Sequence, residues 1–170
     1  MTPIGHLAIG FAAKPGSPRI PLGVLLAASW LLDLLYFIFA FTGLESVENL
    51  TKPGAVPSPY SHGLFMALVW TTLAGLLAWR IYHSRRAGLV IGLVVFSHWV
   101  LDFISWNNLY LFFKGSPQVG LGLFNALGSG TLYIELGLFA VGMTIYLIGR
   151  KRSARESIPR QKDVQNHSHN

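Results

Sequence analysis

The chain of 170 residues contains no cysteine, and only 12% of its residues are charged. Without cysteine there are neither disulfides nor thiolate ligands, so any metal ion has to be held by histidine, aspartate or glutamate. Charged residues make up about 25% of an ordinary soluble domain, roughly twice the share found here. Together with 52% hydrophobic residues and a mean hydropathy of +0.47, this composition indicates a membrane protein.

Acidic residues are also scarce, with seven Asp and Glu against thirteen Lys and Arg and a net charge of +6. Such an excess of positive charge can serve nucleic-acid binding, but here the basic residues lie beside apolar segments and in the C-terminal tail. Contact with anionic lipids and control of membrane topology explain this placement better. We therefore expect the lipid bilayer as a partner, and no nucleic acid.

Four apolar segments are long enough to cross a membrane, which takes ~20 residues of helix. They are residues 20–43, 61–82, 87–106 and the glycine-interrupted 121–149. A fifth segment, 4–13, is too short to cross and is expected to be a half-length or re-entrant helix. The fold predicted is all-α: an integral membrane bundle of four transmembrane helices plus this N-terminal half-length helix.

The remaining segments divide the chain and orient it. Residues 44–59 are polar and proline-rich, which predicts a loop, and residues 150–170 are predicted to be a basic, disordered tail after a membrane domain of residues 1–149. Lys and Arg concentrate in the turns 14–19 and 80–86 and at the start of the tail. Because basic residues near membrane ends stay in the cytoplasm, we expect these turns and the C-terminus to be cytoplasmic.

Six ionisable residues lie at similar depths within the predicted helices. His6 is 13 residues before Arg19 and Asp33 is 14 after it, so both lie ~20 Å from the cytoplasmic ends at about 1.5 Å per residue. The same count gives roughly 18–27 Å for His98, Asp102, Glu135 and His62. His98 and Asp102 are also four residues apart and share one helix face. The six side chains are expected to converge in the outer half of the membrane.

Each of these residues has a simpler explanation when it is taken alone. Asp33 would be stable as a neutral acid bonded to another helix, His6 as a helix cap, and Glu135 beside a water-filled crevice, while His98 and Asp102 would bond each other. None of these explanations predicts a shared depth, and an ionised side chain in hydrocarbon costs several kcal/mol unless it is paired or coordinated. A divalent cation solves this problem. Histidine with carboxylate but no sulfur suits zinc first, and also manganese or iron.

The order of these residues over positions 1–106 resembles a known family. Gly5-His6-Leu7, Asp33, Ser61-His62-Gly63 and Ser97-His98-x-x-x-Asp102 are similar to the pattern of the YdjM-like family of bacterial inner-membrane proteins, described as membrane-bound metal-dependent hydrolases. The resemblance implies a metal site, hydrolase activity and a location in the bacterial inner membrane. Glycine replaces the small hydroxyl residue of the family pattern beside both His6 and His62, and the usual aspartate-rich stretch is reduced to Asp33.

The ligand order also resembles that of zinc-dependent phospholipase C and the related single-strand nucleases. This resemblance implies that Asp33, His62, His98 and Asp102 hold one zinc ion and that His6 and Asp102 contribute to a second. The third-metal motif of that group, His-x-x-x-Glu, is broken here, because Thr131 stands four residues before Glu135.

These patterns predict a metal-dependent hydrolase that acts on a phosphoester of a lipid or another membrane-associated substrate. Metal-activated water would be the nucleophile, with Asp33 or Glu135 orienting or deprotonating it, and the site would open towards the non-cytoplasmic side. Two other functions use the same residues. Buried acids and histidines also form relays in proton or cation transporters, and a polar cluster can simply fix helix packing in a structural membrane protein.

Overall fold

The computed structural model describes residues 3–48 and 57–156, and these residues are mostly helical. The helices are α1 Pro3–Ala13, α2 Leu22–Ser29, α3 Leu31–Phe41, α5 Leu64–Tyr82, α6 Arg85–Ser105, α7 Leu123–Leu127 and α8 Thr131–Glu156, with a short 3-10 helix η1 at Gly128–Gly130. A small antiparallel hairpin joins β1 Leu109–Tyr110 to β2 Gln118–Val119, between the predicted spans 87–106 and 121–149. The prediction of a helical protein is confirmed, apart from this hairpin.

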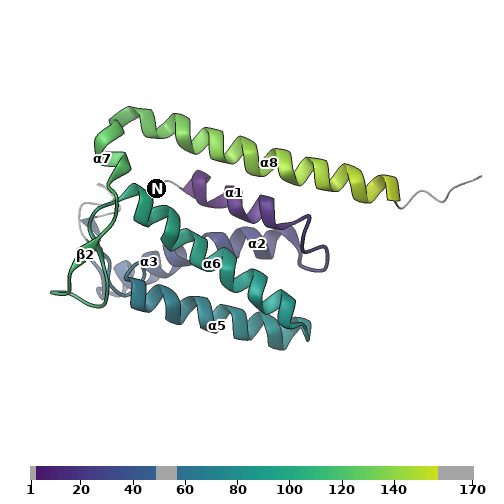
Figure 1. The fold of residues 1–170 in the computed structure, drawn as a ribbon. Coiled ribbons are helices and arrows are strands. Elements are labelled where there is room, and N and C mark those ends of the chain that lie inside the picture. The colour runs from purple at the N-terminus through teal and green to yellow at the C-terminus, as the bar shows by residue number, and fades with distance from the viewer. Residues whose placement is uncertain (1–2, 49–56, 157–170) are drawn as a thin grey trace, which may run out of the picture.

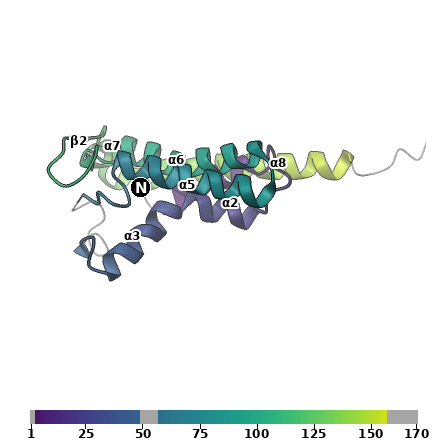
Figure 2. The same ribbon diagram turned by 90° about the horizontal axis from the view of Figure 1, so that it is seen from below.

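Three helices, α5, α6 and α8, are each long and apolar enough to cross a membrane. α2 and α3 together make a fourth candidate only as a bent pair, since their axes differ by 56°. The span predicted over residues 20–43 is therefore broken into two helices, and Figure 2 shows α3 leaving the layer of the other helices. The Ser29 hydroxyl bonds the Leu26 carbonyl at 2.8 Å, a contact that bends helices. Asp33 lies in the first turn of α3, where an acid favours a new helix N-terminus.

The short N-terminal segment does form a half-length helix, α1, which packs against α2, α6 and α8 (Figure 1). The turn that follows α1 is held by Lys14, whose Nζ donates to the carbonyls of Pro18 at 3.0 Å and Ile20 at 2.7 Å. The chain reverses direction in this turn, so that α2 packs beside α1. The packing of α1 places His6 in the interior of the protein.

α6 is the central helix of the fold. Half of its most apolar stretch is buried, against 11% for α5 and for α8, and it packs against α1, α2, α3 and α5. Its contact with α5 depends on glycine, because a Cβ added at Gly88 would lie 2.7 Å from the Gly75 carbonyl oxygen. The outward faces of α5 and α8 expose side chains such as Leu77 and Val141, 61% and 58% exposed. Exposed apolar faces of this extent are typical of contact with lipid.

The last predicted span, 121–149, is divided in the structure. Gly128 has a φ of +52°, a left-handed conformation that favours glycine, and it separates α7 from the long α8. α8 then continues to Glu156, seven residues into the segment predicted to be a disordered tail. Residues 157–170 of that tail, and residues 49–56 of the predicted loop, lie outside the described part of the chain.

The basic segments gather at one end of the molecule. Figure 1 shows the α1–α2 turn, the α5–α6 turn and the basic end of α8 on the same side. The end of α8 packs closely against the α1–α2 turn. A Cβ at Gly149 would collide with the Pro15 side chain. This arrangement agrees with the predicted topology, in which all three segments share one side of the membrane. That this side is the cytoplasmic one stays a prediction.

Candidate metal centre

Five of the six predicted site residues meet in one buried cluster, which we call the His/Asp cluster. Its members are His6 from α1, Asp33 from α3, His62 from the turn before α5, and His98 with Asp102 from α6. They form two groups of potential ligand atoms, His6–His98–Asp102 and Asp33–His62–His98, each with all its atoms within 4.8 Å of one another. The convergence expected from the depth count is therefore found for these five residues.

Four distances define the centre of the cluster. The Nε2 atom of His62 lies 3.3 Å from Asp33 Oδ1 and 3.5 Å from Asp102 Oδ2. The Nε2 atom of His98 lies 3.6 Å from Asp33 Oδ1 and 3.4 Å from Asp102 Oδ2. Two imidazole nitrogens and two carboxylate oxygens thus face one another across a small volume.

The break between α2 and α3 orients His98. A helix leaves its last carbonyls without intrahelical partners, and the carbonyl of Ser29, the last residue of α2, lies 2.9 Å from His98 Nδ1. A carbonyl oxygen can only accept, so Nδ1 carries the proton and Nε2 of a neutral ring presents its lone pair to the carboxylates. Nε2 of His98 has no hydrogen bond to any described residue.

His62 is oriented by a second chain of hydrogen bonds, which ends at Glu45. The Ser61 hydroxyl donates to Glu45 Oε2 at 2.8 Å and lies 2.7 Å from His62 Nδ1. Since the Ser61 proton is used on Glu45, the hydroxyl oxygen accepts from Nδ1–H, and Nε2 of His62 also presents a lone pair to the cluster. Glu45 Oε1 is fixed by the backbone N–H groups of Tyr60 at 2.8 Å and Ser61 at 2.9 Å.

Sequence reasoning missed Glu45 and Ser61 as members of the site. Glu45 falls in the segment 44–59, which was predicted only as a polar loop, yet it is 7% exposed and buried against the turn before α5. One signal was available, because the chain has only seven acidic residues and Glu45 stands close to the end of an apolar segment. Its pairing with Ser61, sixteen positions away, depends on how the loop folds back.

Gly63 accounts for one departure from the family pattern. A Cβ at this position would lie 2.5 Å from the Pro59 carbonyl oxygen and 2.8 Å from that of Phe112. The turn that presents His62 is therefore packed too tightly for any residue with a Cβ. The hydroxyl that contacts His62 comes from the preceding residue, Ser61, instead.

His6 lies behind this centre and stacks on His98, with ring centroids 3.6 Å apart and planes within 2°. Its Nε2 is 3.4 Å from Asp102 Oδ1, the oxygen opposite the one that faces His62 and His98. His6 is 1% exposed, and neither of its ring nitrogens has a hydrogen bond to a described residue. Buried polar atoms of this kind call for a water molecule or an ion as partner.

The cluster is more open on one side than on the other. The side chains of His6, His98 and Asp102 are 1%, 0% and 5% exposed, whereas His62 is 12% and Asp33 21% exposed. Water or a substrate would therefore approach from the Asp33–His62 side. His6 and α6 close the other side of the cluster.

Glu135, the sixth predicted residue, lies on α8 and is 1% exposed. Among the described residues it belongs to neither group of potential metal ligands. Its predicted catalytic role stays a prediction.

No family model matches this chain, and neither a curated protein nor a solved structure does. The resemblance to YdjM-like proteins is therefore carried by the quoted residues alone. Fold and cluster together define a class: a helical protein with helices of membrane-spanning length and a buried group of histidines and aspartates able to hold a metal ion.

Proposed function

We propose that Asp33, His62, His98 and Asp102 bind one divalent cation, zinc, and that the protein is a metal-dependent hydrolase embedded in a bacterial inner membrane. The substrate class is a phosphoester of a lipid or of another membrane-associated molecule. The C-terminus lies in the cytoplasm, and the His/Asp cluster lies in the half of the membrane away from it.

The spacing of the four ligand atoms carries this proposal. Zinc binds imidazole nitrogen and carboxylate oxygen at about 2.0–2.2 Å, so the corners of a regular tetrahedron around it lie about 3.3–3.6 Å apart. The four measured distances run from 3.3 to 3.6 Å. Octahedral magnesium, with bonds of about 2.0–2.1 Å, would bring neighbouring ligands to about 2.8–3.0 Å. These nitrogen–oxygen distances, four of the six edges of such a tetrahedron, fit zinc better than magnesium.

The proton positions on the histidines support the same interpretation. Both Nδ1 atoms are committed to oxygen acceptors, the Ser29 carbonyl and the Ser61 hydroxyl. In neutral rings the two Nε2 lone pairs then face carboxylate oxygens, which is repulsive unless a cation lies between them. A doubly charged ion also neutralises Asp33 and Asp102 in a region where unpaired charge is costly.

The cluster offers fewer ligands for a second ion. His98 Nε2 belongs to both ligand groups, and a single lone pair binds a single ion. Once the first ion takes it, His6 and Asp102 Oδ1 are the two ligands left in the His6–His98–Asp102 group. Two ligands are fewer than the three protein ligands typical of a catalytic zinc site, so the first ion is the main one.

The open side of the cluster supports a hydrolase, because water and substrate can reach a bound metal ion there. A bound zinc ion polarises a phosphoryl oxygen and lowers the pKa of a coordinated water to about 7. Asp33, the most exposed member of the cluster, would orient that water with its second carboxylate oxygen, and Glu135 would be the alternative base. A lipid phosphoester suits a site that opens beside apolar helix faces.

Metal analysis of the purified full-length chain tests the proposal. We expect one zinc per chain by elemental mass spectrometry, loss of that zinc in His98→Ala, and no loss in His83→Asn, which changes an exposed histidine at the other end of the bundle. Hydrolysis of a chromogenic phosphodiester is expected to follow the zinc content. Wild-type protein without stoichiometric metal would contradict the proposal.

A proton or cation transporter is the second candidate, and one observation favours it. The hydrogen-bond chain from His62 through Ser61 to Glu45 leads out of the His/Asp cluster into the loop after α3, as a proton path would. In proteoliposomes a transporter would give a gradient-driven flux that Asp33→Asn abolishes. A hydrolase would show turnover in detergent and no such flux.

A further inference from the structure

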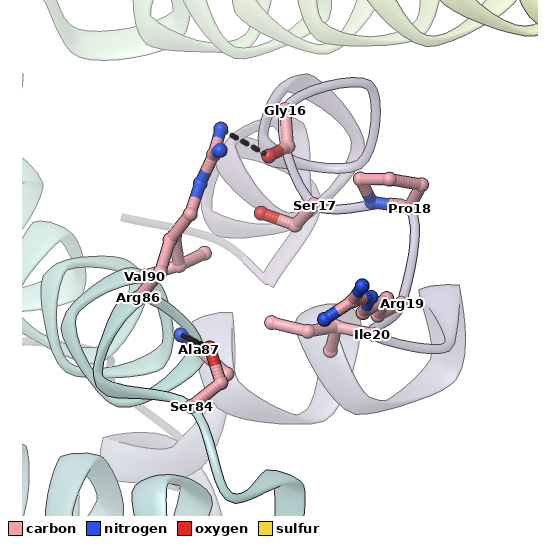
Figure 3. A pocket seen from close by; sticks show the side chains of 9 residues that line it. All are labelled: Gly16, Ser17, Pro18, Arg19, Ile20, Ser84, Arg86, Ala87 and Val90. Atoms are coloured by element: carbon pink, nitrogen blue, oxygen red, sulfur yellow. Dashed lines mark hydrogen bonds between the residues drawn. The ribbon is translucent and has the colours of Figure 1, made fainter.

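A second candidate site lies at the opposite end of the helices from the His/Asp cluster. Figure 3 shows the α1–α2 turn facing the start of α6 across a hollow of about 330 Å³. The turn contributes Ser17, Arg19 and Ile20, and α6 contributes Arg86 and Val90. We call this hollow the basic pocket.

The basic pocket has positive charge without a matching acid. Arg19 and Arg86 both line it, and none of its lining residues is acidic. Arg86 donates from Nη2 to the Gly16 carbonyl at 3.0 Å, which fixes its guanidinium at the rim and leaves its other N–H groups available. Neither arginine forms an ion pair with a carboxylate of residues 3–48 or 57–156.

The hydroxyl of a largely buried serine is also directed into the pocket. Ser17 is only 7% exposed, and its side chain makes no hydrogen bond to any residue that the structure describes. In Figure 3 its hydroxyl points across the hollow towards α6. The hydroxyl is therefore available to donate to a ligand in the pocket.

Apolar residues close the inner part of the pocket. Ile20 is 2% exposed and belongs to the hydrophobic core, and Val90 packs against that core. Both residues belong to segments that lead into the apolar part of the bundle, and Val90 lies on α6, a helix long enough to cross the membrane. The basic pocket thus combines a cationic rim with an apolar inner wall.

We propose that the basic pocket binds the phosphate group of an anionic phospholipid. The ends of membrane-spanning helices lie at the level of lipid headgroups, and basic pockets between helices at this level bind acidic headgroups. Two guanidinium groups match phosphate oxygens through paired hydrogen bonds, and Ser17 supplies a third donor. This site does not depend on the metal proposed for the His/Asp cluster.

Native mass spectrometry of the full-length chain, released from neutral detergent, tests the site. With equal amounts of phosphatidylglycerol and phosphatidylcholine present, we expect one retained phosphatidylglycerol per chain and at least tenfold less in Arg19→Gln/Arg86→Gln. Ser17→Ala, which leaves the charge unchanged, is expected to reduce retention several-fold. Arg19→Lys/Arg86→Lys should restore part of it.

The matched control is Arg150→Gln/Arg152→Gln, which removes the same charge from the basic end of α8. Loss of lipid in this control equal to that in the pocket variant would overturn the proposal, because net charge alone would then explain binding. Equal retention of the two lipids by wild type would overturn it as well. Displacement of phosphatidylglycerol from the wild type by millimolar inorganic phosphate would support recognition of the lipid through its phosphate group. Binding of inorganic phosphate without any retained phosphatidylglycerol would contradict a lipid as the ligand.

Discussion

At the scale of single residues, His62 and His98 are fixed by groups that bind no metal themselves. His98 uses a carbonyl exposed at a helix break, and His62 uses a serine that is held by a buried carboxylate. Such outer contacts set which ring nitrogen faces an ion, and their loss typically lowers metal affinity 10–100-fold. Glu45 should therefore matter to metal binding although it lies outside the ligand set.

Replacing Glu45 by glutamine tests this role. The amide can donate to Ser61, which frees the Ser61 proton for His62 Nδ1 and favours the tautomer with the proton on Nε2. We expect a 10–100-fold higher dissociation constant for zinc, measured by competition with a fluorescent chelator. The pattern of ring ¹⁵N shifts of His62 should report the change of tautomer.

Glu48→Gln is the matched control, because Glu48 is an exposed carboxylate close to Glu45 in the chain. Its zinc affinity should equal that of the wild type. An equal loss of affinity in both variants would show that charge near the site matters and that the hydrogen-bond chain does not.

The candidate site shows which residues a sequence reveals and which it does not. His6, Asp33, His62, His98 and Asp102 are predictable because ionisable side chains are rare in apolar segments and their depth follows from residue counts. Glu45 is not, because a polar residue in a polar loop is unremarkable until the loop is folded. Ser61 stands beside His62 in the sequence, but its role depends on its bond to Glu45. Glu135 satisfies the same depth rule as the five, yet among the described residues it lies in neither ligand group.

At the scale of elements, hydropathy identifies where apolar helices lie but not where they break. Residues 20–43 are almost uniformly apolar, so nothing in their composition marks the bend at Trp30 between α2 and α3. The break depends on the hydrogen bond of the Ser29 hydroxyl to Leu26 and on the contact of the Ser29 carbonyl with His98 of α6. A hydropathy profile contains neither contact. α1 was predicted correctly because its length alone excludes a crossing.

The packing of α8 on α1 gives a prediction for an element. A side chain at Gly142 would collide with the backbone of Ala8, so Gly142→Val should push α8 away from α1. We expect a loss of about 1–3 kcal/mol, seen as a lower midpoint of thermal unfolding in detergent. Gly137→Val is the control in the same helix, because a Cβ there meets no atom within 4 Å. Equal destabilisation by both variants would indicate helix propensity as the cause.

At the scale of the whole molecule, a metal ion that joins α3, α6 and the turn before α5 should stabilise the fold. An ion that binds only the folded state contributes about 2.7 kcal/mol at a free concentration of 100 times its dissociation constant. Removal of metal with a chelator should therefore lower the unfolding midpoint of the wild type, and added zinc should restore it. His98→Ala should show no such shift, and an unchanged wild-type midpoint would contradict a structural contribution of the ion.

The absence of cysteine makes the topology directly testable. Single cysteines can replace Arg85, at the α5–α6 turn, and Lys114, in the hairpin loop, both of which are exposed. With a membrane-impermeant maleimide on intact cells, we expect labelling of Lys114→Cys and labelling of Arg85→Cys only after the membrane is opened. The reverse pattern would invert the proposed orientation, and labelling of both on intact cells would contradict a crossing between them.

The bend at Trp30 also links the shape of the protein to its surroundings. The two sides of the break both contact α6, Ser29 through a carbonyl and Asp33 through a carboxylate, so an ion held there fixes the direction in which α3 leaves the bundle. Energetic coupling of this kind is reciprocal. A bilayer whose thickness favours a different tilt of α3 should therefore change the affinity for the ion, and the protein would sense the thickness of its membrane at the metal site.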